Sequence, residues 1–490
     1  MDEGTVARPG AAGGSVLDVG KFLQGLRITP FHRRLLILSC LVTFFDGLDF
    51  SLIAYTLPYI RDEMQLSEAM MGNVSMAAFI GQMIGSLVGS YAADLVGRRP
   101  IILICTVLAA VLTFITGYAQ TPEMLILLRL VGGLAIGGLL APAWSLNIES
   151  MPKAMRATSV TIIMLGFSAG GSAAGQVANY FAPADGFYAA HVAALGGFLP
   201  GPGWHTVFFF CGGLTFLLAI FLQFTLPEST RWLVAKNKPA ARIAPMIQRF
   251  DPDLDVSRYT GFELSDERKT TARQNPFAKF AELFRGPLAY ITPLIWVAYF
   301  CSSFAIYLKS SFSVLFLEEL DLSVETATNI GSIGGLVGAV FGVVLLMFTE
   351  RRGPAWITIA PLIGIPFLLL IGFGAVLGGP LFIPVILVGT VLVGAGHAAV
   401  ISITSIYYPS AVRSTGGGWA SFMAKFAAVA APYFGSRLFL GSDAKVLDGY
   451  VFSAVCLAGV VICVLALAPF ARRLVDHGAD EPATVQEQTA

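Results

Sequence analysis

The sequence carries little charge. Only 13% of its 490 residues are Asp, Glu, Lys or Arg, and 56% are hydrophobic. Soluble domains carry about 25% charged residues. The excess of apolar side chains is too large for one water-facing fold to bury, so lipid must cover part of the surface, and a soluble enzyme is excluded.

Patterns typical of several other function classes are missing. The chain has no Gly-x-x-x-x-Gly-Lys-Ser/Thr loop, which disfavours an ATP-driven pump. Its formal net charge is zero, which disfavours a surface for nucleic acid. The six cysteines form no close pair with the spacing of a metal site, and we interpret them as packing residues. We therefore expect no metal and no cofactor.

Long apolar runs are abundant. Residues 100–121 and 356–390 are uncharged over the length of about 20 residues that a helix needs to cross the hydrocarbon. A helix suits this environment because it pairs its backbone amides within its own segment. Runs between charged or Pro/Gly-rich breaks predict twelve such helices, near 33–59, 69–93, 100–119, 124–148, 157–181, 205–226, 288–317, 325–349, 354–378, 380–406, 414–438 and 447–470.

Polar segments divide the chain into five parts. The first thirty residues lack the apolar core and cleavage site of a signal peptide, and we expect a flexible lead-in. The predicted parts are an amino-terminal tail at 1–32, an amino-terminal six-helix half at 33–226, a linker at 227–287, a carboxyl-terminal six-helix half at 288–470 and a tail at 471–490.

The basic residues predict the orientation, because Lys and Arg collect on the cytoplasmic side. Of the 31, 25 lie in the two tails, the linker and the loops after even-numbered helices, and only Arg61, Arg437 and Lys445 fall on the opposite, outer side. Both termini and the linker are therefore predicted to be cytoplasmic.

The two halves look like repeats. Segment 152–158, Pro-Lys-Ala-Met-Arg-Ala-Thr, recurs at 409–415 as Pro-Ser-Ala-Val-Arg-Ser-Thr, 257 positions later. Copies of six spans that both start in the cytoplasm are parallel repeats, which enclose a solute site near the midplane. The predicted fold is an all-α membrane protein with twelve transmembrane helices in two six-helix halves, related by a pseudo-two-fold axis along the membrane normal.

Several motifs carry a resemblance. Segment 89–99, Gly-Ser-Tyr-Ala-Ala-Asp-Leu-Val-Gly-Arg-Arg, resembles the most widespread signature of the major facilitator superfamily. Further motifs are Asp-Gly-Leu-Asp at 46–49, Leu-Pro-Glu-Ser-Thr-Arg-Trp-Leu at 226–233, and Tyr-Tyr-Pro at 407–409, which leads through Arg413 to Trp419. Together they resemble the aromatic acid:proton symporter family over essentially all the spans.

The resemblance implies the major facilitator fold and proton-coupled import of an aromatic carboxylate by alternating access. Two features depart from the family and bear on the substrate. Lys425 stands where the family usually has Arg in the eleventh helix, and the outer loop 182–204 is longer.

Ionisable residues inside predicted spans are functional candidates, because a charge inside the bilayer is costly. Asp46 and Asp49 lie three positions apart on one helix face, where two carboxyl groups can share a proton. The alternative is permanent pairing with a neighbouring helix. Arg129, surrounded by glycines, is expected near the depth of Asp49, as a switchable partner or a static anchor.

Two lysines are candidates for binding a substrate carboxylate. We favour Lys425, which lies deeper, whereas Lys309 can instead extend to the outer interface. His397 is a candidate that titrates in the physiological range, or else an ordinary packed histidine. The other substrate-binding candidates are the rings of Tyr55, Trp144, Tyr299 and Tyr307 and the amides of Gln82 and Gln176.

Charged residues at the predicted inner face are gating candidates. Asp94 can form a charge latch with Arg98 and Arg99, although a basic turn that only sets topology is the alternative. We also expect an ion pair between Glu149 and Arg156. The full set of gating candidates is Asp94, Arg98, Arg99, Glu149, Arg156, Glu228, Arg231 and Arg413.

The sequence predicts a monomeric secondary transporter, multi-pass in a bacterial inner membrane, that imports benzoate, hydroxybenzoate or a larger lignin-type acid with protons. Its partners are then an organic anion, protons and the lipid bilayer. The runner-up is a proton symporter for a sugar, sialic acid or nicotinate, which the Pro-Glu-Ser element favours. A membrane receptor that uses the linker as its output is a third hypothesis, and the lack of an apolar core in the linker argues against it.

Overall fold

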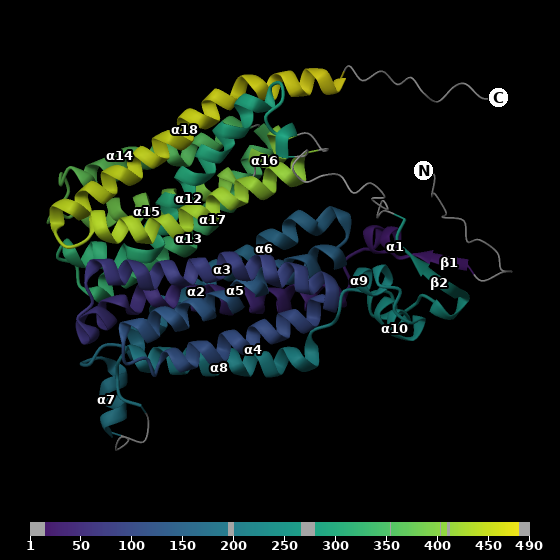
Figure 1. Ribbon diagram of the computed structural model, residues 1–490, viewed down its shortest axis with the longest axis horizontal. Coiled ribbons are helices and arrows are strands. Elements are labelled where there is room, and N and C mark those ends of the chain that lie inside the picture. Colours follow the sequence, from purple (N-terminus) through teal and green to yellow (C-terminus); the bar gives the residue numbers. More distant parts are fainter. Residues whose placement is uncertain are drawn as a thin grey trace.

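The computed structural model describes residues 15–194, 200–265, 280–352, 354–401, 403–408 and 412–479. Long helices form two bundles that lie one above the other in Figure 1. The amino-terminal bundle contains α2 (Pro30–Met64), α3 (Glu68–Val96), α4 (Arg98–Thr116), α5 (Pro122–Ser150), α6 (Arg156–Phe181) and α8 (Trp204–Thr225). The carboxyl-terminal bundle contains α12 (Leu288–Glu319), α13 (Val324–Arg352), α14 (Ile359–Gly372), α15 (Phe382–Val400), α17 (Arg413–Phe439) and α18 (Asp443–Ala479).

Eleven helices of the described chain are long and apolar enough to cross a membrane. The twelfth predicted span, 414–438, is also helical and lies within α17. This helix contains Lys425 and several glycines, which lower its mean hydropathy. Many large apolar side chains on the other helices, such as Leu87, Phe224 and Ile462, are more than 60% exposed, as expected for surfaces that face lipid.

The two bundles repeat a local contact. Arg156 Nε donates to the carbonyl oxygen of Met151 at 3.3 Å, and Arg413 Nε donates to that of Tyr408 at 3.0 Å. Both members of the second pair follow their counterparts by 257 positions, the offset of the sequence repeat. Each arginine also begins a long helix, α6 or α17. The predicted duplication thus extends to backbone geometry.

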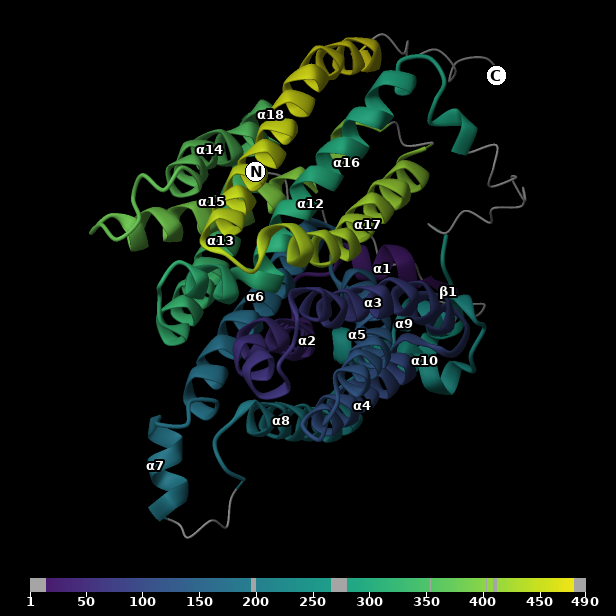
Figure 2. The same cartoon turned by 60° about the vertical axis from the view of Figure 1, so that its left-hand side comes forward.

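The two ends of the bundles differ, as Figures 1 and 2 show. At one end, here named the α7 end, the short helix α7 (Phe187–Ala194) projects from the predicted outer loop. At the other end, the tail end, lie β1 (Ser15–Asp18), α1 (Val19–Gly25), α9 (Thr230–Ala235), α10 (Ala240–Phe250) and β2 (Tyr259–Glu263). Short connections complete the described chain: α16 (Ile403–Tyr407) and the 3₁₀ turns at Lys153–Met155, Val256–Arg258 and Pro354–Thr358.

The amino-terminal tail and the linker fold together at the tail end. Strands β1 and β2 pair in parallel, and α1, α9 and α10 share a core in which Leu23, Ile247 and Phe250 are at most 1% exposed. The expectation of a flexible tail is therefore wrong for residues 15–25. The linker supplies eight of the ten buried residues of this core and the tail supplies Val19 and Leu23, so the expectation that the linker lacks an apolar core is wrong. Hydropathy read along one segment cannot reveal a core assembled from two distant ones.

Candidate functional site

Two acids of α2 face a cavity inside the amino-terminal bundle. Asp46 and Asp49 both line it, together with hydroxyl groups of α4 and α8 that include Thr113. Arg129 Nη1 of α5 lies 3.9 Å from Asp49 Oδ2, and the Thr113 hydroxyl donates to the other oxygen of Asp49. Both charged side chains of this pair are at least 95% buried. The predicted partnership of Arg129 with an acid of α2 is present in the structure.

Asp46 is placed differently. It is 3% exposed, and neither carboxyl oxygen has a described hydrogen-bond partner. Its electrostatic neighbours are Asp49 on its own helix and Lys425 on α17 of the other bundle. A buried carboxyl group with few donors has a low cost for holding a proton and a high cost for losing it. Asp46 is thus a buried acid without a described hydrogen-bond partner, near a cation of the opposite half.

Close packing of α3 on α5 positions Arg129. A Cβ atom at Gly137 would lie 2.2 Å from the carbonyl oxygen of Gln82, which leaves no room for a larger residue. Small residues allow two helix backbones to approach in this way. The predicted close contact around the glycines of α5 is confirmed, and it brings Gln82 and Arg129 to the same cavity between the bundles.

Aromatic rings meet at the centre, between the bundles. The Tyr307 ring of α12 lies 5.1 Å from the Phe79 ring and 6.4 Å from the Phe50 ring of the other bundle. His397 lies 6.2 Å from Tyr307 on the other side, and its Nδ1 is 3.1 Å from the Ser302 hydroxyl. Tyr307, His397, Gln82 and Lys425 are therefore the substrate-binding candidates that the structure places nearest to this central region.

Other substrate-binding candidates lie elsewhere. Tyr299 donates its hydroxyl to the Ile401 carbonyl within the carboxyl-terminal bundle. Trp144 is partly buried on α5, and its Nε1 has no described hydrogen-bond partner. Lys309 does not extend to the outer interface but lines a cavity inside its own bundle. Hydropathy placed these residues in helices and carried no information on which direction they face.

Polar contacts between the halves gather at the α7 end. Arg61 makes a bidentate ion pair with Glu318 at 2.7 and 3.1 Å, and Arg437 donates to Asn73 at 3.0 Å. Two glycines permit the approach, because a Cβ atom at Gly72 would lie 2.0 Å from the Ser436 hydroxyl and one at Gly175 1.9 Å from the Ser332 hydroxyl. We name this set of contacts the α7-end seal.

Amides complete the α7-end seal. Gln176 and Asn179 of α6 both donate to the side-chain oxygen of Asn329 on α13, at 3.0 and 3.2 Å. Tyr55 packs beside them, against Gly175 and Gly331. Gln176 and Tyr55 therefore hold the halves together, and the expectation that they contact the substrate is not supported by their position. Asn329 and Glu318 had no distinguishing signal in the sequence, because polar residues are common at helix ends.

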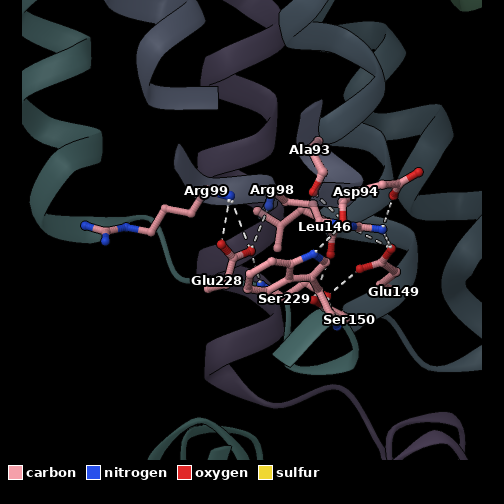
Figure 3. Close-up of polar contacts among 10 residues, drawn as sticks. Ala93, Asp94, Arg98, Arg99, Leu146, Glu149, Ser150, Glu228 and Ser229 are labelled. Atoms are coloured by element: carbon pink, nitrogen blue, oxygen red, sulfur yellow. Dashed lines mark hydrogen bonds and ion pairs between the residues drawn. The ribbon is translucent and has the colours of Figure 1, made fainter. Parts of the chain in front are cut away.

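A second charged group, the tail-end cluster, is centred on Arg98 (Figure 3). Its Nη2 lies 2.9 Å from both Asp94 Oδ1 and Glu149 Oε1, and its Nη1 donates to the Ala93 carbonyl at 3.0 Å. The Ser229 hydroxyl donates to the other oxygen of Glu149. The predicted contact of Asp94 with Arg98 is therefore present, whereas the Arg99 side chain donates to the Gln223 carbonyl instead. The cluster joins α3, α4, α5 and the linker.

Glu228 caps α4. Its carboxylate accepts the backbone N–H groups of Arg98 at 3.0 Å, Arg99 at 3.3 Å and Ser229 at 2.8 Å. The first turn of a helix has unpaired N–H groups and a positive dipole end, so an acid is favourable there. Burial raises the pKa of Glu228, and the backbone hydrogen bonds offset part of that shift.

The remaining gating candidates behave as follows. Glu149 pairs with Arg98 and not with Arg156, whose Nε donates to Met151, so the predicted Glu149–Arg156 pair is absent from the described contacts. Arg99 donates to the Gln223 carbonyl at 2.6 Å. Arg231 lies partly buried on α9, and Arg413 contacts its own bundle. The tail-end contacts described for these residues all stay within one half and its linker.

Comparisons with known proteins agree with this architecture. A model of the Major Facilitator Superfamily matches residues 39–432. The 4-hydroxybenzoate transporter PcaK of Pseudomonas aeruginosa is 28% identical over 468 residues, 94% of this chain and 97% of that protein. The gallate transporter of Pseudomonas putida is 29% identical over 430 residues, 86% of this chain and 88% of that protein.

The fold recurs in solved structures. A bacterial homologue of the human lysosomal transporter Spinster matches with a TM-score of 0.69 at 17% identity, over 92% of this chain and 99% of that one. The family match runs from α2 into α17, and this fold agrees with twelve helices rather than eleven. The chain therefore belongs to the Major Facilitator Superfamily and is a multi-pass membrane transporter, not an enzyme.

Proposed function

We propose that the protein imports an aromatic carboxylate together with protons by alternating access. One observation carries the proposal: the acid Asp46 is buried in one half with neither carboxyl oxygen hydrogen-bonded, and it lies near enough to Lys425 of the other half for the two charges to interact. The names of the relatives, a 4-hydroxybenzoate transporter and a gallate transporter, support an aromatic acid as the substrate.

The arrangement offers a simple coupling scheme. A charged Asp46 neutralises Lys425 across the interface. A proton on Asp46 leaves Lys425 without that counter-charge, and the substrate carboxylate then takes its place. The proton and the anion thus bind better together than either does alone, which is the free energy that couples their transport. Asp49 is already paired with Arg129, so its negative charge is balanced next to Asp46.

The aromatic part of the substrate has a matching surface. Tyr307, Phe79 and Phe50 form an edge-to-face group of rings between the halves. Such a group accepts a planar ring in offset or edge-on contact. Gln82, at the same interface, and His397, behind Tyr307, would orient ring hydroxyl groups.

The contacts at the two ends of the molecule support the assignment of this structure to one state of the transport cycle. The α7-end seal joins the halves, whereas the described contacts of the tail-end cluster stay within one half. We assign the tail end to the cytoplasm, as the basic residues predict, and the structure to a state closed to the outside. In the outward-open state the α7-end seal separates, and the gating candidates at the tail end would then meet the other half.

Uptake into proteoliposomes tests this function. We expect an acidic exterior to drive accumulation of 4-hydroxybenzoate, benzoate or gallate, and sugars and sialic acid not to compete. Asp46→Asn should lower gradient-driven accumulation about tenfold and preserve counterflow, because Asn mimics the protonated acid. Asp253→Asn, an exposed acid of the linker, is the matched control.

Three results would contradict the proposal. A receptor that does not transport would show no counterflow. Competition by a sugar or by sialic acid would assign a different substrate class. Gradient-driven uptake that is unchanged in both Asp46→Asn and Asp49→Asn would remove the proton site.

A further inference from the structure

A cation lies in the carboxyl-terminal bundle without a counter-charge. Lys309 Nζ of α12 donates to the backbone carbonyl oxygen of Thr390 on α15 at 3.1 Å. Among the described residues Lys309 has no ion pair, and no carboxylate lines the cavity beside it. A charge away from water is costly, and inside a bundle it is stabilised by backbone carbonyl groups, as here, or by an opposite charge.

The position has a counterpart in the other bundle. Asp49 on α2 and Arg129 on α5 form the buried pair of the amino-terminal bundle. Lys309 follows Asp49 by 260 positions and Thr390 follows Arg129 by 261, each about one helical turn beyond the repeat offset of 257. The corresponding helices of the two halves therefore hold an ion pair in one bundle and, about one turn further along, a cation facing a carbonyl in the other.

A cavity adjoins Lys309. Hydroxyl-bearing residues Ser313, Tyr450 and Ser453 line it, and its other walls include Leu308, Phe316 and Leu368. The lining contains no carboxylate and no second cation. The Ser453 hydroxyl already donates to the Gly449 carbonyl at 2.9 Å. The Lys309 ammonium group and the hydroxyl groups of Ser313 and Tyr450 remain as the donors that a monovalent anion needs when it leaves water.

The size of the cavity selects the anion. Its volume is about 30 Å³. A water-sized guest needs roughly 10–15 Å³, and benzene occupies an engineered cavity of roughly 150 Å³. An aromatic carboxylate is therefore too large for this space, whereas a single halide ion fits. Water also fits but brings no charge.

We propose that the cavity beside Lys309 binds one chloride ion, separately from the substrate. This chloride supplies in the carboxyl-terminal bundle the negative charge that Asp49 supplies in the amino-terminal bundle. The proposal does not depend on the transported solute, because it concerns a site within one bundle.

Thermal unfolding of the purified full chain tests the site. A ligand that binds only the folded state raises the unfolding midpoint as its concentration rises. At constant ionic strength, replacement of sodium gluconate by sodium chloride or bromide should raise the midpoint in a saturable way. Gluconate is too large to enter. Lys309→Met should abolish the halide response, and Lys445→Met, at an exposed lysine of the same half, should keep it.

Milder variants keep the test decisive if Lys309→Met does not fold. Tyr450→Phe and Ser313→Ala each remove one hydroxyl group and should weaken the apparent halide affinity about fivefold. Bromide soaked into crystals should give an anomalous peak beside the Lys309 ammonium group. The proposal is overturned if the wild-type midpoint is the same in chloride and gluconate, or if these variants keep the full halide response. Failure here leaves the proton-coupled uptake of aromatic acids untouched, because that is measured by transport.

Discussion

The two bundles share a framework and treat buried charge differently. In the amino-terminal bundle, Arg129 faces Asp49 and Arg98 faces both Asp94 and Glu149. In the carboxyl-terminal bundle, Lys309 contacts a carbonyl, and Lys425 has its described acid, Asp46, in the other half. Duplication kept helix positions and the turn at Arg156 and Arg413, and the charges diverged.

This difference suggests that the two bundles have different roles in transport. A bundle that contains its own counter-charges can exchange protons and rearrange ion pairs without a ligand. A bundle with uncompensated cations is completed only when an anion arrives. Substitution of one charged residue at a time tests this difference between the bundles.

Removal of the central cation should have the largest effect. In Lys425→Gln we expect the apparent substrate affinity to fall about 100-fold, because a desolvated carboxylate loses its charged partner. Lys425→Arg should retain most of the activity, since it preserves the charge. Initial rates of 4-hydroxybenzoate uptake over a range of concentrations measure both. A Gln variant with a wild-type KM would remove Lys425 from the binding site and weaken the contrast between the bundles.

Part of this difference between the bundles could be predicted from the sequence. Charges are so rare in the apolar runs that Asp49 and Arg129 had few alternative partners, and their pairing could be predicted. Helix positions followed from hydropathy in the same way: 69–93 and 124–148 were predicted where α3 and α5 lie. The existence of a helix, and the depth of a residue along it, depend on that helix alone and can therefore be predicted from the sequence.

The direction in which a side chain faces, and its partner on another segment, were harder to predict. Gln176 was assigned to the substrate, yet it binds Asn329 in the α7-end seal. Glu149 was paired with Arg156, which is near in sequence, yet its partners Arg98 and Ser229 come from other loops. Short sequence distance favoured the wrong partner, because helix packing brings the correct ones together only in three dimensions.

The tail-end cluster should show the next largest effect. Arg98→Gln leaves the part-buried carboxylate of Glu149 without its cation, and loss of one partner in such a pair costs roughly 1–3 kcal/mol. We expect uptake rates to fall about tenfold. Arg99→Gln is the matched control, since the neighbouring side chain contacts only a carbonyl in the described structure, and it should change rates little. Equal losses in the two variants would mean that total charge, rather than the ion-pair geometry, matters there.

The α7-end seal, where the bundles meet, should respond more weakly. The side chains of Arg61 and Glu318 are about one quarter exposed, and ion pairs that water reaches contribute up to about 1 kcal/mol. Arg61→Glu should therefore shift the conformational equilibrium toward the outward-open state by about threefold. Accessibility of a cysteine introduced at the tail end, measured by alkylation rate, reports the shift. The double variant Arg61→Glu/Glu318→Arg should restore the wild-type rate, and a failure of this rescue would show that other contacts hold the seal.

Protonation of Glu228 should have the smallest effect and the opposite pH dependence to an ion-paired acid. Its pKa is raised in the folded state because its carboxylate is half-buried, so the folded protein binds more protons than the unfolded one above about pH 4.5. The contribution of Glu228 to stability is then greatest at low pH and decreases as the pH rises through the folded pKa. Relative to Glu228→Gln, the wild-type unfolding midpoint should fall by roughly 1–2 °C between pH 4.5 and 7. Glu282→Gln, at an exposed position, should show no such trend, and a wild-type advantage that grows with pH would mean that the backbone hydrogen bonds from α4 outweigh burial.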